Sequence, residues 1–348
     1  MKGKKENVKK VWLEVIRCVA VGLVIFNHTD GFFLYYANTD NALTYLYSLT
    51  LSILCRTAVP LFFMVSGALL LEKQESYHEL LKHRICKILA VIILFSGIQY
   101  GVDIARNRIH TVSMAGFIRG ILSGTIEETY WFLYAYLGIL LILPVMRCVV
   151  REMKKKDFLY LIALAFVLET VLPILGDMLK TEFPSSLIQG NLYIFYMLIG
   201  FYLMHIEWQE SDLKKIMLMG ICAIGTALAA SAAIVMWDSN ILGEYRVDRL
   251  DIFTLVLAVL IFATIKAAGG MTKDFQRCRN VFLHVGKLTF GIYLTEQLVR
   301  TLLLPIYLYL TEKTVGIIAC TVYVLGTYAV AGILVEGMRR LPGFKRFL

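Results

Sequence analysis

The sequence predicts an all-α fold, namely a polytopic bundle of about ten transmembrane helices with both termini in the cytoplasm. Three observations support it: the apolar composition, the length of the apolar segments, and the distribution of lysine and arginine. Hydrophobic residues make up 58% of the 348 residues, whereas soluble domains are usually about 45–50% apolar. The excess is arranged in runs of roughly 20 residues, the length that a helix needs to cross a bilayer. A transmembrane barrel would instead show shorter segments that alternate between apolar and polar residues.

Ten apolar segments are long enough to span a bilayer, and short polar segments join them. The longest connection, residues 105–129, contains MAGFIRGILSG, which is typical of an amphipathic helix at a membrane interface. No connection is long enough to fold alone, so we expect one membrane-embedded domain over residues 1–348, with basic tails at 1–10 and 338–348. The expected spans are 11–36, 43–71, 85–104, 130–147, 158–177, 187–205, 216–237, 250–268, 281–304 and 315–337.

Lysine and arginine are distributed unevenly between the two sides of this predicted bundle. The segments on the side of the two termini hold 25 of these residues, and those on the opposite side hold 7. Cytoplasmic connections of membrane proteins carry the excess of positive charge, so we expect both termini in the cytoplasm and residues 105–129 outside. An even number of spans agrees with this orientation. The net charge of +9 is therefore a signal of topology and does not require a nucleic-acid partner.

Five ionisable residues lie inside the predicted spans, where charge is costly and usually has a function. They are Arg17, His28, Arg56, Glu169 and Glu296. The seven cysteines add no metal site to this set, because no pair of them has the spacing of metal ligands. We interpret the cysteines as small apolar packing residues, and we expect no bound metal.

Arg17 and His28 lie eleven residues apart in the first span. Eleven residues make three helical turns plus roughly 20°, so both side chains lie on one face, about 16.5 Å apart along the axis. Taken alone, Arg17 could extend to the cytoplasmic headgroups, and His28 could be a neutral imidazole that bonds to a neighbouring helix. Together they favour one elongated ligand, because arginine suits a phosphate at one end and histidine suits proton transfer at the other.

Arg56 falls near the middle of the second span, too far from either surface to reach the headgroups easily. Either it contacts a ligand, or it forms a structural ion pair with Glu169 or Glu296. Pro60, four residues further on, frees a backbone carbonyl at this depth. Such breaks are tolerated where protein or a cavity covers them.

Glu296 lies slightly outward of the middle of the ninth span, at a depth similar to that of His28. It can pair with Arg300, four residues further along the helix. Alternatively, it orients His28 and stabilises the charged form of the ring. Glu169, which lies four residues before Pro173, is interpreted as a structural residue.

Four stretches form an ordered set along the chain. The first has an arginine and a histidine separated by ten residues, at Arg17 and His28, and the others read RTAVPLFFMVSGALLL, YWFLYAYLGILLILPVMR and TFGIYLTEQL. In order, spacing and ten-span layout, the set resembles the acyltransferase 3 family of bacterial membrane O-acyltransferases over essentially the whole chain. In one departure, relatives often continue the fourth stretch with Ile-His, where this chain has Thr295 and Glu296.

The resemblance implies an enzyme that transfers an acyl group, usually acetyl, from cytoplasmic acyl-CoA to a carbohydrate hydroxyl of a cell-surface or lipid-linked glycan. It implies a multi-pass protein of a bacterial cytoplasmic membrane. Acyl-CoA is then the donor substrate, the glycan and the lipid bilayer are the other partners, and no nucleic acid takes part. We expect Arg17 and Arg56 to bind the donor.

His28 is the expected general base on the acceptor hydroxyl, with Glu296 as its partner, and a covalent acyl-histidine is the alternative. Trp131 and Tyr134 either stack on sugar rings or belong to the aromatic belt of the membrane interface. Two other functions also fit buried charges, namely a transporter or flippase of a lipid-linked glycan and a membrane sensor that binds its ligand without turnover. The sequence shows no repeated halves of the kind that many transporters have, and this favours the enzyme.

Overall fold

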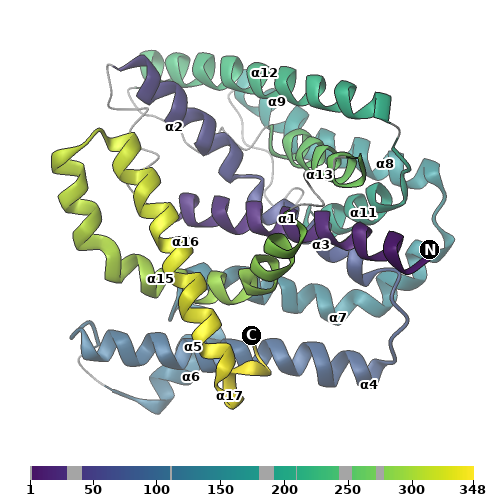
Figure 1. The fold of residues 1–348 in the computed structure, drawn as a ribbon. Coiled ribbons are helices and arrows are strands. Elements are labelled where there is room, and N and C mark those ends of the chain that lie inside the picture. The colour runs from purple at the N-terminus through teal and green to yellow at the C-terminus, as the bar shows by residue number, and fades with distance from the viewer. Residues whose placement is uncertain are drawn as a thin grey trace. The chain divides into compact units, whose positions relative to one another are not determined.

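The computed structural model describes residues 2–29, 41–109, 112–179, 192–208, 210–242, 253–271 and 278–348. Within these ranges every regular element is a helix, which confirms the predicted all-α class. The chain separates into two compact units. The first holds residues 1–70 and 153–333, and the second holds residues 71–152 and 334–348. Figure 1 labels the helices along the chain.

Each of the ten predicted spans contains a helix or a run of consecutive helices. Within the described residues, six helices or runs of consecutive helices are long and apolar enough to cross a membrane, as a multi-pass membrane protein requires. The count of ten spans and the orientation of the termini stay predictions. The six are Ala42–Leu70, Tyr77–Ala105, Glu128–Glu152, Lys155–Gly176, Asp212–Ala230 and Gly316–Arg340.

Helix α1 is the packing centre of the first unit. It runs without a break over Lys2–Asn27 and so includes the basic segment expected as a tail. Apolar residues from Val11 to Ile25 are buried on several sides of the helix, as expected for a helix surrounded by others. Its neighbours are α2 (Ala42–Cys55), α3 (Ala58–Leu70), α13 (Thr254–Met271) and α15 (Arg279–Lys313). The unit also contains α8 (Lys155–Phe166), a wider π-helical turn (Val167–Val171), α9 (Leu172–Leu179), α11 (Leu192–His205), α12 (Glu210–Leu242) and most of α16 (Gly316–Arg340).

The second predicted span is broken into α2 and α3 at Arg56 and Thr57. The proline ring of Pro60 supplies no N–H for the carbonyl of Arg56, four residues earlier, so a continuous helix would lose that hydrogen bond. Thr57 instead turns back on Leu54, whose carbonyl accepts its N–H at 3.0 Å and its hydroxyl at 2.7 Å. The break expected from the proline is therefore present in the structure.

Helices α3 and α11 cross at two glycines, Gly67 and Gly200. A Cβ atom on Gly67 would lie 1.9 Å from the carbonyl oxygen of Met197, and one on Gly200 would lie 2.1 Å from the carbonyl oxygen of Met64. Small residues allow backbones to approach in this way in membrane bundles. The end of α11 is fixed by Lys266, whose ammonium group donates hydrogen bonds to three carbonyls at or just after this end, at 2.5–2.7 Å.

The second unit contains α4 (Tyr77–Leu80), a π-helical turn (Leu81–Ile85), α5 (Cys86–Ala105), α6 (Met114–Ser123), a short 3₁₀ turn (Glu128–Tyr130), α7 (Trp131–Glu152) and α17 (Pro342–Lys345). Helix α6 covers the segment predicted to be amphipathic. The hydroxyl of Ser113 caps its start, and Gly124 ends it in the left-handed conformation, as is usual at helix ends. Its apolar side chains Met114, Ile118 and Leu122 are exposed and recur every four residues.

Glu75, just before α4, forms ion pairs with three cationic side chains of the second unit. Arg84 binds both of its carboxylate oxygens, Arg147 of α7 donates at 2.9 Å, and Lys73 lies at 3.1 Å. The hydrogen bond from Arg84 is the main reason that the pKa of the Glu75 carboxyl lies far below its usual value, and Arg147 and Lys73 lower it further. This cluster ties the start of the third predicted span to the end of the fourth.

Candidate functional site

His28 marks the end of α1. Its N–H still donates to the carbonyl of Val24 at 3.0 Å, as in a helix. The next residue, Thr29, turns back on Phe26 through both its N–H and its hydroxyl, at 3.1 and 2.6 Å. The His28 side chain is 16% exposed. Because the helix is unbroken, Arg17 and His28 lie along one helix axis, as the spacing predicts.

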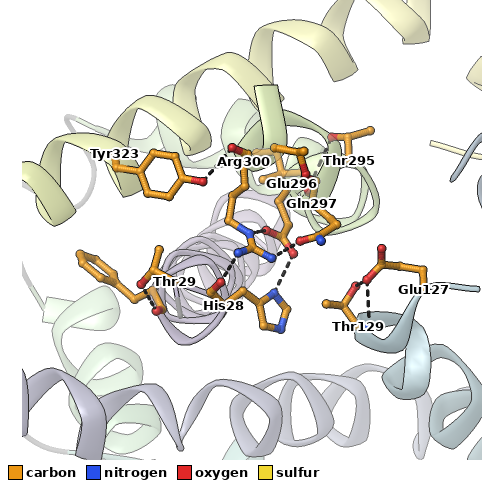
Figure 2. A network of polar contacts seen from close by, with 12 residues as sticks. His28, Thr29, Glu127, Thr129, Thr295, Glu296, Gln297, Arg300 and Tyr323 are labelled. Carbon is orange, nitrogen blue, oxygen red and sulfur yellow. Dashed lines mark hydrogen bonds and ion pairs between the residues drawn. The ribbon is translucent and has the colours of Figure 1, made fainter. Parts of the chain in front are cut away.

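Glu296 is fully buried in α15 and lies between His28 and Arg300 (Figure 2). Its Oε1 atom is 2.7 Å from Nδ1 of His28, and its Oε2 atom accepts a hydrogen bond from Nε of Arg300 at 2.8 Å. The two contacts that the sequence suggested as alternatives for Glu296 are thus both present, one on each oxygen. A buried carboxylate is tolerated when it is paired and hydrogen-bonded in this way.

Arg300 makes further contacts with the same part of the first unit. Its two terminal nitrogens donate to the backbone carbonyl of His28 and to the side-chain oxygen of Gln297. Its own carbonyl accepts a hydrogen bond from the hydroxyl of Tyr323, on α16, at 2.7 Å. Figure 2 shows these residues around the end of α1. Tyr323 could not be selected from the sequence, because its contact depends on how α15 and α16 pack, whereas the spacing of three residues between Gln297 and Arg300 on one helix was an available signal.

The contact with Glu296 determines which nitrogen of a neutral His28 ring can act as a base. A carboxylate only accepts hydrogen bonds, so Nδ1 must carry the proton, and the lone pair is then on Nε2. Within the described part of the chain, no group hydrogen-bonds Nε2. With a neutral ring, the charges of Glu296 and Arg300 cancel. The arrangement can therefore take up one proton at Nε2 and place the resulting positive charge beside a carboxylate.

Arg17 pairs with a carboxylate of its own helix. Its Nη1 atom lies 3.0 and 3.1 Å from the two carboxylate oxygens of Glu14, one turn earlier in α1. Gly286 of α15 packs against this carboxylate, and a Cβ atom there would lie 2.4 Å from it. The spacing of three residues was the available signal for the pair. The Arg17 side chain remains 31% exposed.

Arg56 and Glu169 also lie in the first unit. Arg56 is partly buried where α2 meets α3. Both oxygens of Glu296 are engaged by His28 and Arg300. Glu169 lies in the π-helical turn of its span and accepts a hydrogen bond from the hydroxyl of Tyr196, which is consistent with the structural role expected for it.

Trp131 and Tyr134 belong to the second unit, in the first turn of α7. Trp131 is 44% exposed. The hydroxyl of Tyr134 donates to the carbonyl of Ile121 at 2.7 Å, and its ring lies against Gly124. Tyr134 therefore fastens the end of α6 to α7, and a role of either ring in binding sugar stays a prediction. Among the described residues, no cluster of three or more His, Cys, Asp or Glu side chains could hold a metal ion.

Comparison with protein families identifies one relationship. A family model described as an acyltransferase domain matches residues 10–336, nearly the whole chain. No curated protein and no solved structure matches.

Proposed function

Because the chain belongs to this acyltransferase family, we propose that it transfers an acyl group, most simply acetyl, from acyl-CoA to a hydroxyl of a cell-surface or lipid-linked glycan. In this proposal it is an O-acyltransferase of a bacterial cytoplasmic membrane. The observation that supports it best is the contact between His28 and the buried Glu296, which leaves Nε2 of the ring able to accept a proton. Family membership also favours catalysis over the transporter and sensor alternatives.

His28 acts as the general base in the proposed reaction. Its Nε2 atom takes the proton of the acceptor hydroxyl as the oxygen attacks the thioester carbonyl, and a tetrahedral oxyanion forms. Glu296, hydrogen-bonded to Nδ1, compensates the positive charge that the ring gains. The intermediate then collapses, the C–S bond breaks, and His28 returns the proton to the sulfur of CoA. A positioned base contributes roughly 10²–10⁴-fold to such a reaction. The covalent alternative uses the same nitrogen, which would carry the acyl group between the two substrates.

Arg17 and Arg56 bind the donor in the proposed arrangement. Arg17 is partly exposed, and Glu14 engages only its Nη1 atom, so other guanidinium N–H groups remain for a phosphate. The separation of about 16.5 Å between Arg17 and His28 along a continuous helix is comparable to the length of a pantetheine arm. The donor would therefore place its phosphates near Arg17 and its thioester near His28.

Acyl transfer by membranes that contain the full chain tests this function. Radiolabelled acetyl-CoA and a glycan acceptor fraction are added, and base-labile label in the glycan is counted. We expect transfer by the wild type and almost none by His28→Gln, because glutamine hydrogen-bonds but does not accept a proton at neutral pH. His78→Gln, at an exposed position of the second unit, is the matched control and should transfer normally. Near wild-type transfer by His28→Gln would contradict the catalytic role of His28, and no transfer by the wild type with any glycan fraction would contradict the function.

A further inference from the structure

We propose that Arg300 is a positioning residue that fixes both the backbone and the carboxylate partner of His28; this inference rests on the proposed function. The guanidinium group donates to Oε2 of Glu296 at 2.8 Å and also to the backbone carbonyl of His28. One side chain on α15 thus holds the end of α1 and the residue that orients the imidazole. The relative position of ring and carboxylate depends on this double contact.

Arginine is suited to this role for geometric reasons. Its guanidinium is planar and carries five donors in a fixed fork, and here it binds Glu296, the His28 carbonyl and Gln297 in different directions. The carbonyls of the last helical turn have no partner within their own helix, and a cation at a helix C-terminus is stabilising. A lysine keeps the charge, but its three donors share one nitrogen atom and lack the wide planar fork that reaches these separate acceptors.

Arg300 is itself held in place by α16. The hydroxyl of Tyr323 donates to the Arg300 carbonyl at 2.7 Å, and the Tyr323 ring stacks on Tyr307 with ring centres 4.6 Å apart. The Arg300 side chain is 11% exposed. A continuous line of contacts therefore leads from α16 through Arg300 to His28.

The contacts of Arg300 favour a role in positioning His28 over a role in binding the donor. All three guanidinium nitrogens donate to acceptors of the protein itself, whereas Glu14 engages only Nη1 of Arg17. Loss of Arg300 should therefore change the rate of transfer and leave donor affinity almost unchanged. A misplacement of about 1 Å at a reacting group can lower a rate by roughly 10²-fold.

Steady-state kinetics of the purified full-length chain test the inference. For Arg300→Lys we expect kcat to fall by roughly tenfold to a hundredfold with the KM for acetyl-CoA changed less than about twofold, since substrate binding that is unaltered leaves KM unchanged. Arg17→Lys should show the opposite pattern and is the matched control. A wild-type kcat for Arg300→Lys, or a raised KM with unchanged kcat, would overturn the positioning role.

A second pair of variants covers the case in which Arg300→Lys does not accumulate. Glu296→Gln together with Arg300→Gln leaves no unpaired charge in the protein interior, so this double variant should fold. Compared with Glu296→Gln alone, it should have a lower kcat, because the contact with the His28 carbonyl is lost, and an equal KM. An equal kcat in the two variants would overturn the inference. If the wild type itself transfers no acyl group, the proposed function fails first, so the two failures are distinguishable.

Discussion

Nδ1 of His28 lies 2.7 Å from Oε1 of Glu296, although the two lie 268 positions apart in the sequence. The contact joins the end of α1 to the middle of α15, and Arg300 occupies the other carboxylate oxygen at 2.8 Å. An imidazole whose Nδ1 faces a buried carboxylate has a defined tautomer and a defined direction for Nε2.

Glu296→Gln should lower kcat for acyl transfer by roughly 10²-fold or more, because a neutral amide neither fixes the tautomer of His28 nor compensates the charge of the protonated ring. Arg300 would also lose its ionic partner, and breaking a buried pair typically destabilises a protein by about 3–5 kcal/mol. Kinetics must therefore be normalised to folded protein, measured by size-exclusion chromatography in detergent.

The double variant His28→Gln with Glu296→Gln checks whether the two residues act as a unit. If they do, it should be no slower than His28→Gln alone, because the effects of residues that act together are not additive. Rate losses that multiply in the double variant would show that Glu296 acts independently of His28.

Arg17→Lys should raise the KM for acetyl-CoA and leave kcat nearly unchanged, since lysine keeps the charge but loses the bidentate fork that suits phosphate. The control is Arg151→Lys, the same change at an exposed position at the end of α7. An unchanged KM together with a large drop in the amount of protein would assign Arg17 to the structure, as the partner of Glu14.

Much of the fold could be predicted because the signals are local. Apolar runs of helical length identify the helices, and Pro60 locates the break between α2 and α3. His28 and Glu296 could be selected as candidates because each is an ionisable group in an apolar stretch, and Arg300 could be named as a possible partner of Glu296 four residues away. The contacts of Glu296 with His28 and with Arg300 were expected only as alternatives, since similar depth in two spans does not determine which helices are neighbours.

Other features depend on tertiary packing and cannot be recognised from the sequence. Gly286 next to Glu14, and the acceptors of the Lys266 ammonium group, come from helices that are far apart in the sequence. The same holds for Gly67 and Gly200, which nothing in the sequence distinguishes from glycines with open space around them.

Gly200→Ala should destabilise the protein by at least about 1–3 kcal/mol, because its Cβ atom would lie 2.1 Å from a backbone oxygen of α3. Backbone atoms at a helix crossing cannot move aside as a flexible side chain can. Gly220→Ala is the matched control, since it lies in α12 with nothing within 4 Å of the added atom, and there alanine should stabilise by about 0.5–1 kcal/mol. Thermal unfolding in detergent measures both, and equal midpoints would contradict the tight crossing.

The second unit should lose stability in acid through Glu75. Its cationic partners hold the pKa of the folded carboxyl below the ordinary value of 4.5. A lowered folded pKa stabilises the fold above the unfolded value, and this contribution is lost as the pH falls from about 4.5 towards the folded pKa. At pH 7, Glu75→Gln should cost about 1.5–3 kcal/mol, as expected for hydrogen bonds to a charged group.

Unfolding midpoints between pH 7 and pH 3 measure this effect. The midpoint of Glu75→Gln should depend less on pH than that of the wild type over the acid range. Glu152→Gln, an exposed carboxylate at the end of α7, should follow the wild type. Parallel curves for Glu75→Gln and the wild type would rule out Glu75 as the source of the acid sensitivity.

Both termini should lie in the cytoplasm and residues 105–129 outside, because the positive charges lie overwhelmingly on the side of the termini. Two exposed side chains of the second unit offer matched positions for thiol labelling, Met114 in α6 at 74% exposure and Tyr77 in α4 at 78%. In intact cells, an impermeant maleimide should label Met114→Cys above the wild-type background, which comes from the native free cysteines. Tyr77→Cys should be labelled only after the cells are broken. The reverse pattern would invert the topology, and the donor would then have to reach Arg17 from outside the cell.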